Sequence, residues 1–221
     1  MTTQLADIDR QDASTLVCDH LICAHCGIID RDHSRIRRGS KCSTCGKESE
    51  GGRLAFPISI HILVDLVQQA YHSTAPVGPI SGPQVPSIGT ILLFCTLREA
   101  LLNWFLVRRL RAQGVPPAII EKLLADNRLA NQKFGDLFTS AIGCKWEEAV
   151  AEASRSVSGD FAPISKLMRN AAAIRNTFLH EGQAWEATRE IATECVNAMP
   201  LLVGLFATLH NVYVRPLQHD L

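Results

Sequence analysis

The stretch CAHCGIIDRDHSRIRRGSKCSTCG, residues 23–46, forms the centre of a small N-terminal module. Its two ends repeat one pattern, a Cys-x-x-Cys pair followed by glycine, and 15 residues lie between the pairs. Two residues between cysteines let both sulfurs face one tight turn, and the glycine relieves strain where the backbone turns toward them. Cys23, Cys26, Cys42 and Cys45 are therefore predicted to bind one metal ion.

The four-sulfur set predicts a structural zinc ion. Zinc favours a tetrahedral thiolate site, and four protein ligands leave no open position for a substrate. The chain begins MTTQLADIDRQD, which lacks the basic and then apolar order of a secretory signal, so we expect a cytoplasmic protein with reduced cysteines. Four nearby residues are the alternative ligands, and these are Cys18, His20, His25 and His33. The more distant Cys95, Cys144 and Cys195 are expected to be small buried residues.

A basic loop joins the two cysteine pairs. Residues 31–41 carry five arginines and lysines against one acidic residue. On a rigid module such a loop can contact phosphates, so Arg35, Arg37, Arg38 and Lys41 are candidate RNA-binding residues. An ordinary solvated tip is the alternative. The loop has no aromatic residue to stack on bases, which argues against sequence-selective binding.

Composition limits the partners of the whole chain. The 221 residues are 47% hydrophobic and 20% charged, as in a globular protein, and suffice for one core with a small appendage. Their formal net charge is zero, so any site for a polyanion must be local. The apolar stretch 88–107 contains Arg98, Glu99 and Asn103, and charges are expensive inside a bilayer. It is predicted to be a core helix, and no membrane association is expected.

The remaining sequence predicts a mainly α fold. We place a zinc-ribbon module in residues 1–52, a helix and a Pro/Gly-rich connector in 53–86, and a helical bundle in 87–221. Apolar residues spaced three and four apart predict a helix over 58–72. Further helices are expected over 87–113, 117–127, 129–142, 145–157, 163–180 and 184–214. Pro200 is expected to kink or divide the last of these.

One segment before the last helix differs from ordinary packing sequence. It reads IRNTFLHEG, residues 174–182. On a helix, Asn176 and His180 share a face, and Arg175 lies about 140° from His180. A histidine can move the proton of a ribose 2′-hydroxyl or of the leaving oxygen, while an arginine stabilises the charge gathering on phosphorus. Together these groups suit cleavage of RNA without a metal.

This segment resembles the Arg-x4-6-His motif of HEPN domains. The resemblance covers residues 87–215 and rests on Arg175, Asn176 and His180, with a glycine nearby and a final helix after them. It implies a helical bundle that forms a homodimer, so that two motifs face one cleft, with Arg175 and His180 as the catalytic pair and Asn176 as the polar residue beside them. Glu99, on the long helix, is a candidate to support His180, and the alternative is a solvated or structural group.

The resemblance also implies a biological role. Active members of the family are metal-independent endoribonucleases that leave a 2′,3′-cyclic phosphate, and many act as toxins or in defence against phage. An antitoxin or other regulatory protein is then an expected partner. The alternative for Arg175 and His180 is that they stabilise the C-terminal end of a helix. The alternative for the whole chain is a non-catalytic adaptor that binds nucleic acid, a nucleotide or a partner protein.

Overall fold

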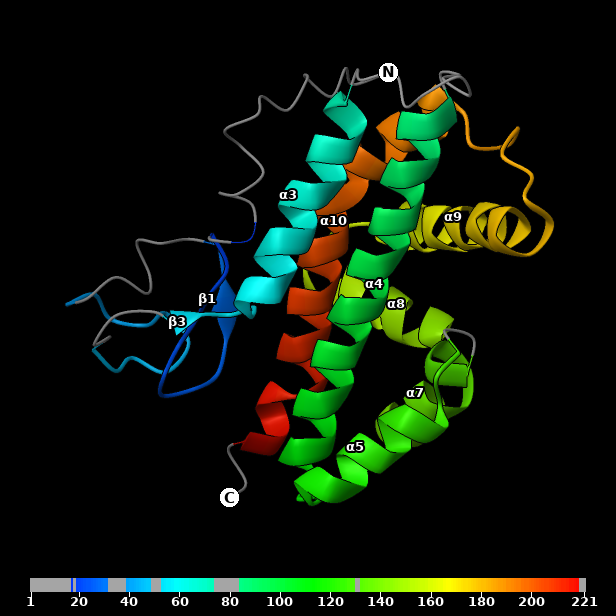
Figure 1. Ribbon diagram of the computed structural model, residues 1–221. Helices are drawn as coiled ribbons and strands as arrows, with labels where there is room; N and C mark the ends of the chain where they lie inside the picture. Colours follow the sequence, from blue (N-terminus) through cyan, green and yellow to red (C-terminus); the bar gives the residue numbers. More distant parts are fainter. Residues whose placement is uncertain are drawn as a thin grey trace.

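The computed structural model describes residues 17, 19–31, 39–48, 53–73, 84–129 and 132–218. This part of the chain is mainly helical, with a small three-stranded sheet and a cysteine cluster ahead of the helical part. The fold class expected from the sequence is confirmed. In Figure 1 the sheet lies beside a set of long helices.

The sheet consists of three two-residue strands. They are β1 (Leu21–Ile22), β2 (Ile29–Asp30) and β3 (Arg53–Leu54), in the order β2-β1-β3 with both pairs antiparallel. Strands this short are not stable in isolation, so they need support from a metal ion or from neighbouring elements. Because β3 follows Gly51 and Gly52, the sheet joins residues from both sides of that glycine pair.

Three long helices run side by side in Figure 1: α3 (Ile58–His72), α4 (Gln84–Ala112) and α10 (Arg189–Tyr213). The helix α4 packs against both α3 and α10, and α3 runs in the opposite direction to the other two. The helix α9 (Ala162–Glu181) lies across them and also packs on α4 and α10. The helix α9, which carries the Arg-Asn-x-x-x-His motif near its C-terminal end, therefore forms a separate layer of the bundle.

Shorter elements connect α4 to α9. They are α5 (Pro117–Asp126), a π-helical segment η2 (Lys133–Leu137), α7 (Phe138–Ile142) and α8 (Trp146–Ser156), and a 3-10 turn η3 (Arg215–Gln218) follows α10. Gly114, with φ of 79°, ends the turn after α4, and Pro117 starts α5. One expected α-helix over 129–142 is instead a π-helical turn followed by a short α-helix.

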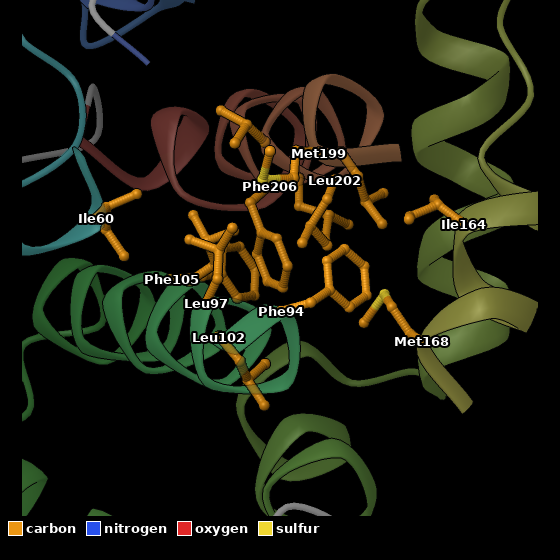
Figure 2. Close-up of a cluster of buried hydrophobic side chains, with 14 of the residues drawn as sticks. Ile60, Phe94, Leu97, Leu102, Phe105, Ile164, Met168, Met199, Leu202 and Phe206 are labelled. Atoms are coloured by element: carbon orange, nitrogen blue, oxygen red, sulfur yellow. The ribbon is translucent and has the colours of Figure 1, made fainter. Parts of the chain in front are cut away.

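The main core lies where α4, α9 and α10 meet. Phe94 and Phe105 of α4 contact the side of α10 that carries Phe206, and Ile164 and Met168 of α9 cover one end of the cluster (Figure 2). All five side chains are buried. Burial of such side chains stabilises the fold by about 1.5 to 3 kcal/mol each, which fixes α9 against the two long helices.

Two helices are long and apolar enough to cross a membrane, namely α4 over Ser87–Ala112 and α10 over Arg189–Tyr213. In each, 56% of the most apolar window is buried inside the protein, as in the core of a soluble protein. For α4 this agrees with the sequence expectation of a core helix.

The helix α10 continues through Pro200, so the expected division of this segment does not occur. Proline has no N–H to donate, and the carbonyl of Val196 one turn earlier consequently has no helical donor. Four residues later the same helix contains Gly204, and both residues weaken a helix. Packing of α10 in the core offsets these losses.

Asn211 of α10 fastens the small sheet to the helices. Its Oδ1 accepts a hydrogen bond from the Ile29 amide (2.8 Å), and its Nδ2 donates to the Ile29 carbonyl (2.7 Å). Around this pair, the His20 and Phe56 rings contact edge to face, and Phe56 packs on Trp104 of α4. One side chain therefore pairs with both backbone polar groups of Ile29 in the outer strand β2.

Replacing Asn211 by alanine is expected to loosen the sheet without unfolding the bundle. Both polar groups of Ile29 would lose their partner, which costs about 1 to 3 kcal/mol per group when burial is retained. Hydrogen exchange of the Ile29 amide should accelerate tenfold or more, since about 1.4 kcal/mol corresponds to a factor of ten. Asn197→Ala on the same helix is the control. Unchanged exchange at Ile29 in the Asn211 variant would contradict this role.

Protonation of the buried His210 is expected to destabilise the contact between α10 and Trp104 of α4. It is fully buried in α10, and its ring stacks on Trp104 with centroids 5.7 Å apart. Burial, and after it the charge of Arg108, lowers the pKa of His210 from 6.5 to about 4. The folded state therefore binds a proton less readily than the unfolded state, and stability from neutral His210 is complete above pH 6.5 and is lost as the pH falls toward 4.

The free energy of unfolding should accordingly fall by about 3 kcal/mol between pH 7 and pH 4 through this residue. Urea unfolding of wild type and of His210→Phe at several pH values measures that contribution as the difference between the two proteins. His72→Gln, at an exposed position on α3, is the control. Parallel pH curves for wild type and His210→Phe would show that His210 does not titrate as described.

Candidate functional site

The two cysteine pairs form matching turns. The Gly27 amide donates to the Cys23 carbonyl (2.9 Å), and the Gly46 amide donates to the Cys42 carbonyl (2.8 Å). Both glycines have positive φ, 66° and 70°, a backbone conformation that side chains disfavour. Each turn is closed by a further bond from its first cysteine amide, to the carbonyl of Ile28 or Lys47. The repeated sequence thus folds into two equivalent knuckles.

The knuckles bring four sulfur atoms together. Those of Cys23, Cys26, Cys42 and Cys45 all lie within 4.8 Å of one another, and the Cys26 and Cys42 sulfurs are 3.7 Å apart. Sulfurs at about 2.3 Å from a tetrahedral zinc ion would be about 3.8 Å apart. Three of the four cysteines are buried. The cluster can therefore hold one metal ion such as zinc.

The thiols of Cys26 and Cys42 differ in pKa. Burial raises the pKa of Cys26 to about 12 despite an opposing backbone hydrogen bond from Ile28. Burial also acts on Cys42, but hydrogen bonds from the Cys45 and Thr44 amides outweigh it and lower its pKa to about 7. Cys42 thus favours the thiolate that a metal requires, whereas Cys26 would release its proton on metal binding.

The alternative ligands are engaged elsewhere or lie outside the described residues. His25 donates from Nε2 to the Glu48 carbonyl (3.2 Å), and the buried His20 packs against Phe56. Cys18 and His33 are not among the described residues. Cys95 and Cys195 are buried in the main core, as expected, whereas Cys144 is half-buried.

Most of the basic loop lies outside the described residues. This applies to the candidate RNA-binding residues Arg35, Arg37 and Arg38. Lys41 is described, is exposed, and forms a β-bridge with Glu48 next to the second knuckle. Its ammonium group is therefore accessible to solvent beside the cysteine cluster.

The motif occupies the C-terminal end of α9. Gly182 ends the helix with φ of 69°, and its amide donates to the Phe178 carbonyl (2.9 Å). The backbone thus closes the helix. Arg175 instead reaches Glu99 of α4, with Nη1 3.0 Å from Oε1. Stabilisation of the helix end does not account for the position of Arg175.

Glu99 joins two arginines. Besides Arg175, it contacts Arg98, whose Nη2 lies 3.5 Å from the same oxygen. The Arg98 side chain is buried, donates to the Met168 carbonyl of α9 (2.9 Å), and lies over the Phe134 ring. Burial lowers the pKa of Arg98, and the charge of Glu99 opposes this effect. The cluster carries one negative and two positive charges and fixes α9 against α4.

The other motif residues are accessible. Asn176 and His180 are exposed and lie four residues apart on α9. Among the described residues, no hydrogen-bond or ion-pair partner of His180 is found, so Glu99 holds Arg175 and not the histidine. Leu179 (54% exposed) and Trp185 (67% exposed) lie next to the motif in the sequence. The end of α9 thus combines a fixed arginine with a free imidazole and apolar side chains.

Two features escaped the sequence analysis. One is the Asn211 contact to Ile29, which joins residues 182 positions apart. The other is an apolar groove on the side of α10 that carries Gly204. The signal for the groove was present, because Pro200 and Gly204 are spaced four apart in an otherwise apolar helix.

The chain matches no family model, no curated protein and no solved structure. The geometry defines a mainly helical protein with a cluster of four cysteines that can hold a metal ion and a polar cluster between α4 and α9.

Proposed function

We propose that the protein is a metal-independent endoribonuclease of HEPN type whose catalytic residues are Arg175 and His180. The observation that supports this most is the pairing of Arg175 with Glu99, from a helix 76 residues earlier, beside an exposed His180. A half-buried arginine with its position fixed binds a phosphate at little cost in ordering. An imidazole without a partner among the described residues can exchange protons with a 2′-hydroxyl.

Glu99 leaves Arg175 able to bind an anion. The carboxylate engages only one terminal nitrogen of the guanidinium, which has five N–H donors in total. The second cation, Arg98, is shared with the same carboxylate, so the cluster keeps a net positive charge. In our proposal Arg175 stabilises the charge on phosphorus, His180 transfers the proton, and Asn176 binds the substrate beside them.

A homodimer is part of the proposal. One protein chain contributes a single copy of the motif, with Arg175 and His180, and the resemblance implies that two motifs face one cleft. Leu179 and Trp185 are large apolar side chains exposed next to the motif. A second copy placed there would cover them and build the cleft. The ribonuclease would act in the cytoplasm as a toxin or defence effector, held in check by an antitoxin or regulator.

The cysteine cluster is proposed to hold a structural zinc ion. Its four ligands close the coordination sphere, and the ion would hold the two knuckles together. The module would then present the basic loop, including Lys41, to the RNA backbone. No chemical step is assigned to the ion.

The adaptor function remains the second candidate because the basic loop and the groove on α10 could both serve binding alone. RNA cleavage distinguishes the two. Purified protein incubated with mixed RNA without added divalent cations should cleave it, and Arg175→Ala should lose about two to three orders of magnitude in rate.

Arg169→Ala is the matched control. It removes an arginine from the same helix, but Arg169 is exposed and, among the described residues, pairs only with the exposed Glu147 and with Ser165. It should cleave RNA at the wild-type rate. Wild-type protein that binds RNA without cleaving it would favour the adaptor, and equal activity of the two arginine variants would contradict the assigned site.

A further inference from the structure

An open groove of about 1400 Å³ lies between the small sheet, the junction of α8 with α9, and one face of α10. Its lining is mainly apolar and includes Ile28, Val157, Pro163, Leu167, Leu201 and Val212. A large apolar hollow is unusual on the surface of a monomer and marks a site of association. None of the motif residues lines it.

The floor of the groove is built for close approach. A Cβ added at Gly204 would meet nothing within 4 Å, so nothing inside the chain requires glycine there. In the middle of a helix, glycine is about 1 kcal/mol less favourable than alanine. Pro200, one turn earlier, lines the same groove and removes a helical hydrogen bond. Small or helix-weakening residues on the open side let an external element come near the α10 backbone.

The occupant must be convex. The groove is a hollow bounded by the sheet, by the α8–α9 junction and by α10. An apolar element that projects from its own surface would fill it.

The same chain carries such a ridge on α3. Ile58 (69% exposed), Ile62 (52%) and Leu66 (38%) follow one another at intervals of four residues, and Leu54 of β3 (48%) precedes them. This spacing places Ile58, Ile62 and Leu66 on one face of the helix. Figure 1 shows α3 at the edge of the three long helices. A solvated helix face normally carries charged residues, so this one indicates an interface.

Charges orient the ridge in the groove. The ridge has the exposed Arg53 at one end and Asp65 near the other. The groove has Glu194 toward the start of α10, and it has Arg31, Arg215 and Asp30 toward its end, where the net charge is positive. The favourable orientation therefore places the Arg53 end near Glu194 and the Asp65 end toward the two arginines.

We propose that the α3 ridge of one copy docks into the α10 groove of the next copy. The contact joins two different surfaces of the chain, so it closes into a dimer where a two-fold axis makes it reciprocal and otherwise propagates into a ring or a filament. It uses the N-terminal end of α9, whereas the motif lies about 18 Å further along that helix, 12 residues at 1.5 Å each. Assembly is therefore independent of the proposed ribonuclease activity and of its dimer.

The test uses the full-length protein carrying Trp185→Glu, which removes the dimer proposed at the motif. Sedimentation velocity over a concentration series should show mass growing beyond a monomer. Gly204→Leu, which fills the groove floor, and Ile62→Glu, which breaks the ridge, should each give a monomer. Ile119→Glu, at an exposed position on α5, is the control and should assemble like its parent.

Mixing the two blocked proteins identifies the geometry. Gly204→Leu retains a ridge and Ile62→Glu retains a groove, so an equimolar mixture should form a one-to-one complex and nothing larger. Ile58→Lys replaces Ile62→Glu if circular dichroism shows the latter unfolded. A parent protein that stays monomeric at all concentrations would overturn the proposal. So would assembly unaffected by either substitution, or a mixture that contains only monomers. None of these readouts involves RNA, so failure here leaves the proposed activity standing.

Discussion

His180→Ala is expected to lower the rate of RNA cleavage by about 10² to 10⁴ fold, the range typical for loss of a general acid or base. The reason is local, since His180 is exposed on α9 and has no partner among the described residues. Thermal unfolding should therefore be unchanged. Single-turnover cleavage of a labelled RNA measures the rate without interference from product release.

His72→Ala, at an exposed histidine on α3, is the matched control and should cleave like wild type. Expression of wild type should also impair growth of the host, and His180→Ala should relieve this. Cleavage by a folded His180→Ala protein at the wild-type rate would show that the histidine takes no part in the reaction.

Cys42→Ser is expected to abolish zinc binding and to unfold the small sheet. Its backbone hydrogen bonds make Cys42 favour the thiolate, in contrast to Cys26, and serine supplies no sulfur. Structural zinc contributes about 10 to 16 kcal/mol of apparent binding free energy in small modules, which two-residue strands cannot replace. Bound zinc should fall from one ion per chain to none, and limited proteolysis should cut within residues 19–48.

The helical signal in circular dichroism should persist, because the main core and the cysteine cluster are separate groups of buried residues. Cys144→Ser is the control, since Cys144 lies outside the cluster and its sulfur is 3.8 Å from the Tyr213 hydroxyl. A Cys42→Ser protein that keeps one tightly bound zinc ion would show that the four cysteines are not the ligand set.

Local sequence signals were sufficient for the helices and for the cysteine knuckles. The spacing of apolar residues predicted α3 over the residues it occupies, and Gly114 with the following prolines placed the break between α4 and α5. These signals act within a turn or two of the chain. The π-helical turn at 133–137 was missed because periodicity at short range does not distinguish it from an α-helix.

Contacts between distant segments could not be predicted from the sequence. Glu99 was a candidate to support His180, but the angle of α9 across α4 brings Arg175 to it instead. The Asn211 contact and the groove likewise depend on how the sheet sits against α10. Such arrangements follow from packing of several elements, which no single segment specifies.

The central claim is that Arg175 and His180 cleave RNA through its own 2′-hydroxyl. It is tested most directly with two RNAs of one sequence, one of which has a single 2′-deoxy sugar at the cleaved position, without added divalent cations. Mass spectrometry of the products should detect a 2′,3′-cyclic phosphate from the first RNA and an intact bond at the substituted position of the second. Equal cleavage of both RNAs at that position would contradict the account.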